Sequence, residues 1–155
     1  MLRIATPTDL GAIYRIEIAC FKEHRFRKDH VDWILRNERA ATFVEESADG
    51  AVIAAIMLLF EVQFCRVLSI ATMPDRRREG LGTRMMQAAE AEARRRGCTR
   101  VRLEVSTRNY GAIEFYRGLG YKTDGVLYGY YSWGEDAYSM VRSLVDETDA
   151  PPANS

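Results

Sequence analysis

The stretch from Ser69 to Arg96 constrains the fold of this chain more than any other. An apolar run over residues 67–73 predicts a buried strand, and an arginine-rich turn after it ends in Gly80-Leu81-Gly82, where a long helix begins. The first amides of a helix have no partner within the helix and lie at the positive end of its dipole. Glycine lets an anion approach these amides because it has no side chain. The stretch therefore predicts a site for phosphate or pyrophosphate.

The spacing of the glycines separates three kinds of anion site. A nucleotide P-loop requires Gly-Lys-Ser/Thr, which occurs nowhere in the chain. A dinucleotide-binding turn requires G-x-G-x-x-G directly after its strand, but Met85 stands at the third glycine position here. The remaining pattern, [Q/R]-x-x-G-x-[G/A], is met by Arg77-Arg78-Glu79-Gly80-Leu81-Gly82. An ordinary glycine-started helix beside a solvated basic loop is the alternative.

Length and composition are typical of one globular domain. The chain has 155 residues, of which 47% are apolar and 28% charged. A formal net charge of zero gives no support for bulk attraction to nucleic acid or membrane. No apolar run approaches the ~18 residues of a membrane-spanning helix, and the N-terminus lacks a signal-peptide pattern. Three cysteines without a pairing motif are expected to be free thiols, which indicates a cytoplasmic protein.

Hydrophobic periodicity predicts the element order β-α-α-β-β-β-α-β-α-β-β. This order indicates a mixed α/β sheet covered by helices, in one domain over residues 1–145. The near-continuous apolar run over residues 51–60 predicts a central strand covered on both faces. Residues 146–155, acidic and then rich in proline and alanine, are expected to form a disordered tail. Strands are expected at 2–5, 42–46, 52–60, 66–73, 100–105, from 121 and from 135 to 144, and helices after Thr6 and at 29–39, 80–96 and 109–119.

The element order and four motifs resemble the Gcn5-related N-acetyltransferase (GNAT) superfamily. The glycine turn is similar to its pyrophosphate signature. Three further stretches resemble the ribosomal-protein-alanine N-acetyltransferase branch. The resemblance implies a single-domain fold with a mixed, mostly antiparallel sheet, splayed at the cofactor site and covered by about four helices. It also implies acetyl-coenzyme A (acetyl-CoA) as cosubstrate. The three stretches are Leu103-Glu104-Val105, Asn109 to Tyr121, and Gly129-Tyr130-Tyr131 followed by Gly134-Glu135-Asp136-Ala137.

The resemblance also implies which residues contact the cofactor. In this family the strand before the glycine turn bulges away from its neighbour, and its free backbone groups bind the pantetheine arm and face the thioester oxygen. An asparagine at a later helix start also contacts the cofactor, although an ordinary helix cap is an equal alternative for it here. The implied residues are Ile70, Ala71 and Thr72 for the pantetheine arm, Arg77, Arg78, Glu79, Gly80, Leu81, Gly82 and Thr83 for the pyrophosphate, and Asn109 and Tyr116.

Glu104 is the candidate general base. Alternation along residues 101–105 places Val101, Leu103 and Val105 on one face of a strand and Glu104 on the other. A carboxylate near the end of a strand can take a proton from an amine through a water. Acetylation needs a neutral amine, and an α-amine, with a pKa of about 8 against about 10.4 for lysine, requires only a weak base. A surface glutamate paired with Arg102 or with an arginine of the neighbouring strand is the alternative.

Tyr116 is the candidate general acid. A phenol suits the protonation of a departing thiolate, and the resemblance suggests the same spacing between base and acid. The alternative is a core side chain, because Ala112, Phe115 and Leu119 share its helical stripe.

Phe26, Tyr130 and Tyr131 are the candidate substrate-binding residues. Tyr130 and Tyr131 resemble family aromatics near the acceptor amine, although they could simply pack one ring and expose the other. The alanine N-acetyltransferase branch has an aromatic-Pro-Trp-Ser-like segment after its first helix, and residues 21–27 depart from it with F-K-E-H-R-F-R. Basic residues in this segment could favour an acidic acceptor. His24 and His30 lack a nearby cysteine or paired acid, so no metal site is expected.

These observations predict an acetyl-CoA-dependent N-acetyltransferase that transfers acetyl directly to a primary amine. A protein N-terminal α-amine is the leading acceptor, and a small-molecule amine is the alternative. No cysteine has the histidine context of a covalent acetyl-enzyme. A non-catalytic CoA-binding module is a second alternative, and nucleic-acid binding through the arginines at 76–78 and 94–96 is a third. We expect a monomer or homodimer without nucleic-acid or membrane partners.

Overall fold

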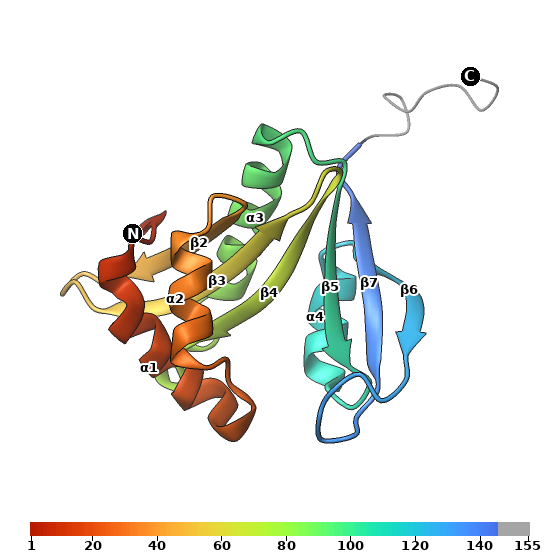
Figure 1. Ribbon diagram of the computed structural model, residues 1–155, viewed down its shortest axis with the longest axis horizontal. Helices are drawn as coiled ribbons and strands as arrows, with labels where there is room; N and C mark the ends of the chain where they lie inside the picture. Colours follow the sequence, from red (N-terminus) through yellow and green to blue (C-terminus); the bar gives the residue numbers. More distant parts are fainter. Residues whose placement is uncertain (146–155) are drawn as a thin grey trace.

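The computed structural model describes residues 1–145, and the predicted tail at 146–155 lies outside the described residues. A seven-stranded sheet in the order β1-β2-β3-β4-β5-β7-β6 forms its centre (Figure 1). Neighbouring strands are antiparallel except β4 and β5, which are parallel. The predicted mixed, mostly antiparallel sheet is therefore confirmed. The strands are β1 (Leu2–Ile4), β2 (Ala40–Glu46), β3 (Val52–Phe60), β4 (Phe64–Thr72), β5 (Arg100–Ser106), β6 (Lys122–Leu127) and β7 (Ala137–Ser143).

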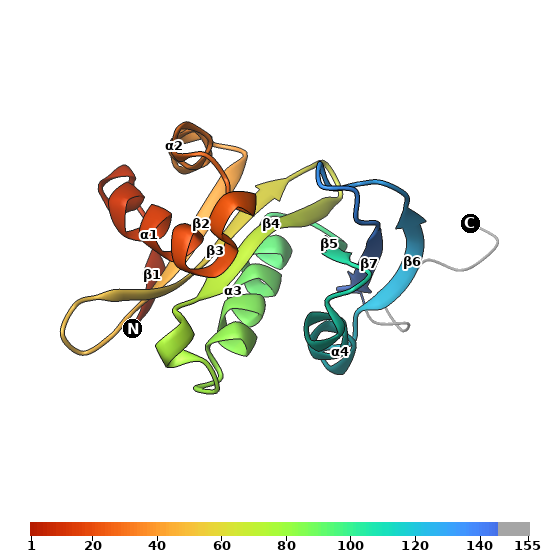
Figure 2. The same cartoon turned by 90° about the horizontal axis from the view of Figure 1, so that it is seen from below.

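Four α-helices within residues 1–145 cover the two faces of the sheet. Figure 2 shows α1 and α2 on one face and α3 and α4 on the other. None of the helices in this part of the chain has the length and hydrophobicity needed to cross a lipid bilayer. The helices are α1 (Leu10–Phe21), α2 (Lys28–Arg36), α3 (Leu81–Arg95) and α4 (Tyr110–Gly118), and short 3-10 segments are η1 (Pro7–Asp9), η2 (Lys22–His24) and η3 (Pro74–Arg76).

Strand β3 is covered on both faces, as its apolar run predicts. Ile56 and Leu58 are buried in the core cluster that includes α3 and α4. Ala55 and Met57 are buried in the cluster that includes α1 and α2. Successive side chains of a strand point to opposite faces, so both sets become buried only because helices cover both sides of the sheet.

Strands β4 and β5 separate after a short stretch of pairing. In the described part of the chain they pair only at residues 64–66 of β4 and 100–102 of β5. Beyond these residues the two strands diverge and leave a V-shaped gap in the sheet (Figure 1). On its other edge β4 carries a bulge, because Met57 pairs with Ser69 and Leu58 with Val67, so that Leu68 is an extra residue. A bulge bends the strand that contains it, and the splay expected at this strand is observed.

Candidate functional site

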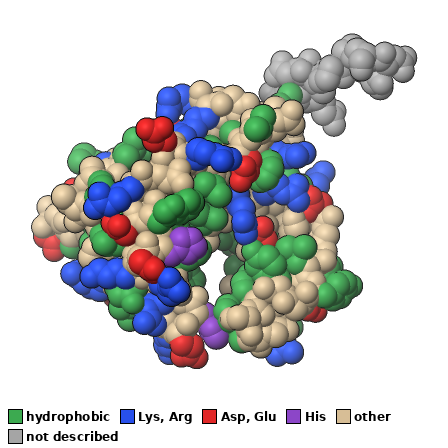
Figure 3. All heavy atoms as spheres, viewed as in Figure 1, with side chains coloured by type: hydrophobic (Ala, Val, Ile, Leu, Met, Phe, Trp, Pro, Cys, Tyr) green, Lys and Arg blue, Asp and Glu red, His purple; other side chains and the backbone are tan. Residues whose placement is uncertain are grey.

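Glu104 lies beside the gap, on the sheet face that carries α1 and α2. The alternation predicted for β5 is observed: Val101, Leu103 and Val105 are buried on the α3 and α4 face, and Glu104 is half-buried on the other. Glu104 follows the last β4–β5 pair, at Arg102, by two residues. Figure 3 shows that side chains do not fill the gap completely, because an opening remains between the two halves of the molecule.

Arg66 on β4 holds the Glu104 carboxylate across the gap. Its Nε lies 3.1 Å from Oε1 and 3.2 Å from Oε2 of Glu104, and its Nη2 donates to the Tyr130 hydroxyl at 2.7 Å. The alternative pairing with a neighbouring-strand arginine is thus present, whereas Arg102 bonds to Asp124 at 2.9 Å. One guanidinium therefore joins the candidate base on β5 to a candidate substrate residue in the loop between β6 and β7.

Tyr116 approaches from α4, on the opposite face of the sheet from Glu104. The residue is 7% exposed and belongs to the core, as the alternative interpretation proposed. Burial, with a smaller contribution from Tyr131, raises the pKa of Tyr116 to about 12. Within residues 1–145 its hydroxyl forms no hydrogen bond. Tyr116 is thus a core ring whose phenol proton is not shared with any described residue.

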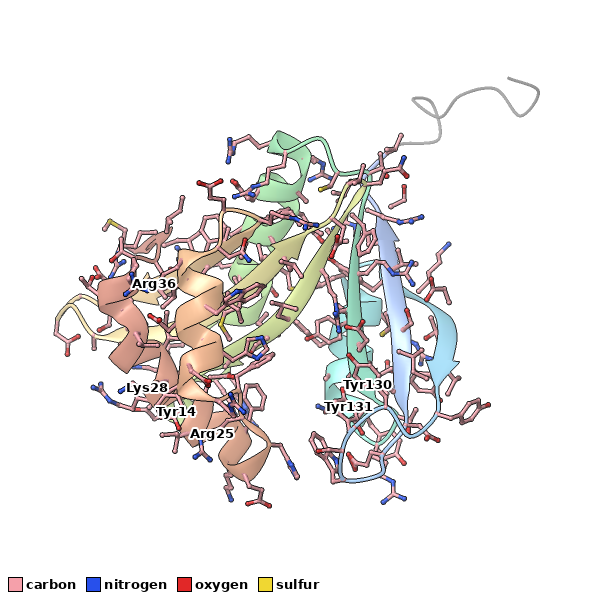
Figure 4. The ribbon with its side chains drawn as sticks, in the orientation of Figure 1. Tyr14, Arg25, Lys28, Arg36, Tyr130 and Tyr131 are labelled. Atoms are coloured by element: carbon pink, nitrogen blue, oxygen red, sulfur yellow. The ribbon has the colours of Figure 1, made fainter. Side chains whose placement is uncertain are left out.

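Tyr131 is linked to Glu104 through Tyr130 and Arg66. Burial raises the pKa of Tyr131 to about 12, and the charges of Tyr130 and Glu104 add to this shift. The rings of Tyr130 and Tyr131 meet edge to face, with centroids 5.0 Å apart. Figure 4 shows both tyrosines on the side of the gap opposite α1 and α2. Arg66 and Tyr130 therefore connect Glu104 with Tyr131, and the charge of Tyr131 contributes to the raised pKa of Tyr116.

An aromatic stack that the sequence did not predict joins the two halves at the end of the gap away from the β4–β5 pairs. Trp133 of the β6–β7 loop stacks on His24 of η2 with ring centroids 3.6 Å apart, and on Tyr131 at 4.7 Å. Glu135 accepts a hydrogen bond from Trp133 Nε1 at 2.9 Å, which fixes the indole. The departure of residues 21–27 from the expected segment was the one available signal. Among residues 1–145, no group of three or more histidine, cysteine, aspartate or glutamate side chains could hold a metal ion, at His24 and His30 or elsewhere.

The glycine turn has the backbone of an anion site, but its two glycines serve different purposes. Gly80 has a φ of 76° and Arg78 one of 74°, both in the left-handed region. The first α3 bond runs from Arg84 N–H to the Gly80 carbonyl, so the preceding amides have no helical partner. A Cβ at Gly82 would lie 3.1 Å from Cζ of Phe115. The expectation that glycine keeps side chains away from an anion is thus incomplete, because Gly82 lets α3 approach α4.

The end of β4 near the gap contacts Cys20 of α1, which in turn contacts Arg77. Ile70 packs against the α3 and α4 core, and Ala71 is buried on the opposite face. Both lie past the last β4–β5 pair, so among the described residues the edge facing β5 has no strand partner at these positions. Cys20 Sγ donates to the Thr72 carbonyl at 3.2 Å, and Arg77 Nη2 lies 3.7 Å from that sulfur. Arg77 is therefore held between the end of β4 and the glycine turn.

Asn109 caps α4. Its Oδ1 accepts a hydrogen bond from the Ala112 N–H at 3.2 Å, as the alternative interpretation proposed. The other end of the amide, Nδ2, makes no hydrogen bond within residues 1–145.

A buried carboxylate on α1 was missed by sequence reasoning. Glu17 of α1 is 2% exposed. Its Oε2 accepts from the Ser69 hydroxyl at 2.9 Å, and its Oε1 accepts from the Phe26 N–H at 3.3 Å. Burial raises the pKa of Glu17, against these two hydrogen bonds. Glu17 thereby ties Phe26, whose ring packs into the core, to the bulged part of β4. Because helical periodicity assigns its position to the buried face, a carboxylate there was the available signal.

The chain matches the family model described as "Acetyltransferase (GNAT) family" over residues 10–121. It is 35% identical to an N-alpha-acetyltransferase of Sulfurisphaera tokodaii, with 92% of each chain covered. Its structure is similar to that of the ribosomal-protein-S18-alanine N-acetyltransferase of Escherichia coli, with a TM-score of 0.84, 26% identity, and 99% of this chain and 98% of that chain covered. Ard1 of Thermoplasma volcanium gives a TM-score of 0.85 at 30% identity, with 94% and 98% covered.

Proposed function

Because the chain belongs to the GNAT family and is an N-acetyltransferase, we propose that it transfers acetyl from acetyl-CoA directly to the N-terminal α-amine of a protein. The relative from Sulfurisphaera tokodaii, named as an N-alpha-acetyltransferase, supports this acceptor class over nearly the whole chain. Acetyl-CoA is the cosubstrate. An α-amine, with a pKa of about 8, also needs less help to lose its proton than lysine does.

The observation that carries the proposal is the Glu104 carboxylate, held at the gap by Arg66. In the proposed reaction Glu104 takes a proton from the acceptor ammonium through a water. The amine nitrogen then bonds to the acetyl carbon while the carbon–sulfur bond breaks, and Tyr116 gives its proton to the sulfur. The acylated nitrogen loses its second proton through water, which restores the Tyr116 phenol, and Glu104 releases its proton to solvent. A phenol whose pKa is raised to about 12 stays protonated at neutral pH, so Tyr116 is in the form that can act as the acid.

The cofactor side of the proposal uses β4 and the glycine turn. The free edge of β4 at Ile70, Ala71 and Thr72 would pair with the pantetheine arm and supply amides to the thioester oxygen. The amides at the start of α3 would bind the pyrophosphate, with cationic help from Arg77 and Arg78. A non-glycine residue in the left-handed region, such as Arg78, is typical of a functional turn. Asn109 would reach the cofactor through its free Nδ2.

The acceptor side of the proposal uses Tyr130, Tyr131 and Phe26. The two tyrosines lie at the gap beside Glu104, where they would flank the chain end. Glu17 anchors the Phe26 backbone, so Phe26 would shape the opposite wall of the acceptor pocket.

The test is acetylation of three acceptor classes with labelled acetyl-CoA. These are peptides with a free N-terminus, peptides with a blocked N-terminus and an internal lysine, and small amines such as polyamines and aminoglycosides. We expect the free-N-terminus peptides to be modified fastest. Glu104→Gln and Tyr116→Phe should each reduce kcat, by about 100-fold for the base. Glu114→Gln and Tyr110→Phe serve as controls, because both side chains are exposed on α4.

Two results would contradict the proposal. Faster acetylation of small amines than of any peptide would favour a small-molecule acetyltransferase. Undiminished turnover in both Glu104→Gln and Tyr116→Phe would remove the assigned chemistry.

A further inference from the structure

The gap between β4 and β5 is bounded at both ends by contacts between its two walls. At one end the strands are hydrogen-bonded at residues 64–66 and 100–102. At the other end the rings of His24 and Trp133 are stacked, with centroids 3.6 Å apart. A polypeptide whose end lies near Glu104 therefore cannot leave through either end of the gap while both contacts hold. Its following residues must cross one of the flanking surfaces, and α1 and α2 form one of them.

The surface of α1, α2 and the segment between them contains a cluster of Tyr14, Arg25 and Lys28, which we call the Tyr14 cluster. The Arg25 guanidinium carbon lies 5.7 Å and the Lys28 ammonium 5.8 Å from the centroid of the Tyr14 ring. Arg25 Nε also donates to the Tyr14 hydroxyl at 3.1 Å. Figure 4 shows these three residues on the α1 and α2 side of the gap, with Tyr130 and Tyr131 on the other side.

Among the described residues, neither cation of the Tyr14 cluster has a carboxylate partner, in contrast to two other arginines in or next to α2. Arg27 pairs with Asp29, and Arg36 with Asp32. Within residues 1–145, Arg25 contacts only the Tyr14 hydroxyl and the Lys22 carbonyl as hydrogen-bond acceptors, and no ion pair involves Lys28. Both side chains are exposed. The chain as a whole has a formal net charge of zero, and no carboxylate within residues 1–145 neutralises these two cations.

We propose that the Tyr14 cluster binds acidic side chains located a few residues after the N-terminus of the acceptor protein. This inference rests on the proposed function, because it concerns the chain that follows the acetylated amine. An extended chain advances about 3.3 Å per residue, so residues shortly after the first can reach α1 and α2. Arg25 presents a planar fork suited to a carboxylate. The Tyr14 ring holds both cations in place, which lowers the entropy lost when a carboxylate binds.

The experiment compares peptides that share their first three residues and carry glutamate, glutamine or lysine at positions four to eight. With wild-type protein we expect kcat/KM to be about three- to tenfold higher for the acidic peptide than for the neutral one, because exposed ion pairs are individually weak. The preference should arise in KM rather than kcat. It should also decline at high salt, since exposed charges are screened.

A charge swap identifies the residues responsible. In Arg25→Glu/Lys28→Glu the preference should invert toward the lysine peptide, and in Arg25→Gln/Lys28→Gln it should disappear. Arg94→Glu is the control, because Arg94 is an exposed arginine on α3, and α3 lies on the other face of the sheet (Figure 2). Its preference for the acidic peptide should equal that of the wild type.

Three outcomes would overturn the inference. The first is an equal kcat/KM of the wild-type protein for the acidic and the neutral peptide. The second is a preference for the acidic peptide that remains in Arg25→Glu/Lys28→Glu. The third is tight binding of a single-stranded oligonucleotide that depends on Arg25 and Lys28, while peptides show no charge preference. Peptide affinity measured by fluorescence anisotropy without acetyl-CoA separates this inference from the proposed function. If no peptide is acetylated but the acidic peptide still binds more tightly and the swap inverts this order, the cluster is supported and the proposed function fails.

Discussion

Arg66 and Glu104 form an ion pair across the gap between β4 and β5, with Arg66 Nε within 3.2 Å of both carboxylate oxygens. The same guanidinium donates to the Tyr130 hydroxyl at 2.7 Å. Arg66 therefore connects the two walls of the gap and the β6–β7 loop at one point. It orients the carboxylate that we propose as the base, and it sets the position of a tyrosine proposed to contact the acceptor.

Arg66→Lys is expected to lower kcat/KM for the acceptor by about tenfold, because a lysine cannot reproduce a planar fork that bonds to two partners. Most of the loss should appear as a raised KM for the peptide, since Tyr130 is released, and the KM for acetyl-CoA should change little. Steady-state kinetics with each substrate varied in turn measures both. Arg102→Lys is the control, because Arg102 pairs with Asp124 instead of Glu104. An equal loss in the two variants would contradict this role for Arg66.

Tyr116→Phe is expected to reduce kcat by about 10- to 100-fold through loss of a general acid while leaving the unfolding temperature nearly unchanged. Stability should be retained because the Tyr116 hydroxyl has no hydrogen-bond partner within residues 1–145 to lose. The pKa of Tyr116 is raised to about 12, so the phenol stays neutral from pH 7 to 10. The wild-type rate should therefore not fall over that range because of this residue. A kcat in the variant equal to that of Tyr110→Phe would exclude Tyr116 as the acid.

The sequence predicted the parts of this fold that depend on local pattern. The apolar run of β3, the alternation around Glu104 and the glycine turn before α3 each depend on periodicity or backbone freedom within a few residues. The boundaries differ mainly at α2, which ends at Arg36 because Asn37 has extended backbone angles. The cap at Asn109 was also foreseen, as one of two interpretations.

The contacts that define the site depend on which segments meet in space. Arg66 faces Glu104 only because β4 and β5 are parallel and separate after three pairs. His24 meets Trp133 because two loops from opposite halves end at the same place. Neither contact produces a periodic pattern in the amino-acid sequence. The packing requirement for glycine at position 82 could not be predicted either, because it comes from the close approach of Phe115 on α4.

Gly80→Ala is expected to lower the free energy of unfolding by about 1 kcal/mol, because alanine is strained in the left-handed region. The same substitution at Gly50 should cost about as much, since Gly50 also has positive φ and open space around it. Only Gly80→Ala should raise the KM for acetyl-CoA, because only this turn presents amides to the proposed pyrophosphate site. Chemical denaturation and steady-state kinetics on both variants test this. Equal KM values in the two variants would argue against the assignment of the turn.

Glu17→Gln is expected to stabilise the protein at neutral pH and to have little effect near pH 4. Burial raises the pKa of Glu17 above its usual range, so the folded state keeps this proton to a higher pH than the unfolded chain does. Stability contributed by the protonated form is present at low pH and is lost as the pH rises from the unfolded pKa, about 4.3, through the folded one. Glutamine cannot ionise, yet its oxygen can accept from the Phe26 N–H and its NH2 can donate to the Ser69 hydroxyl.

Urea midpoints of wild type and the Glu17→Gln variant between pH 4 and 8 measure the difference in stability. For Glu114→Gln, whose side chain is 73% exposed, the difference from wild type should stay flat. A Glu17→Gln difference that does not grow with pH would show that the buried charge is not what limits stability.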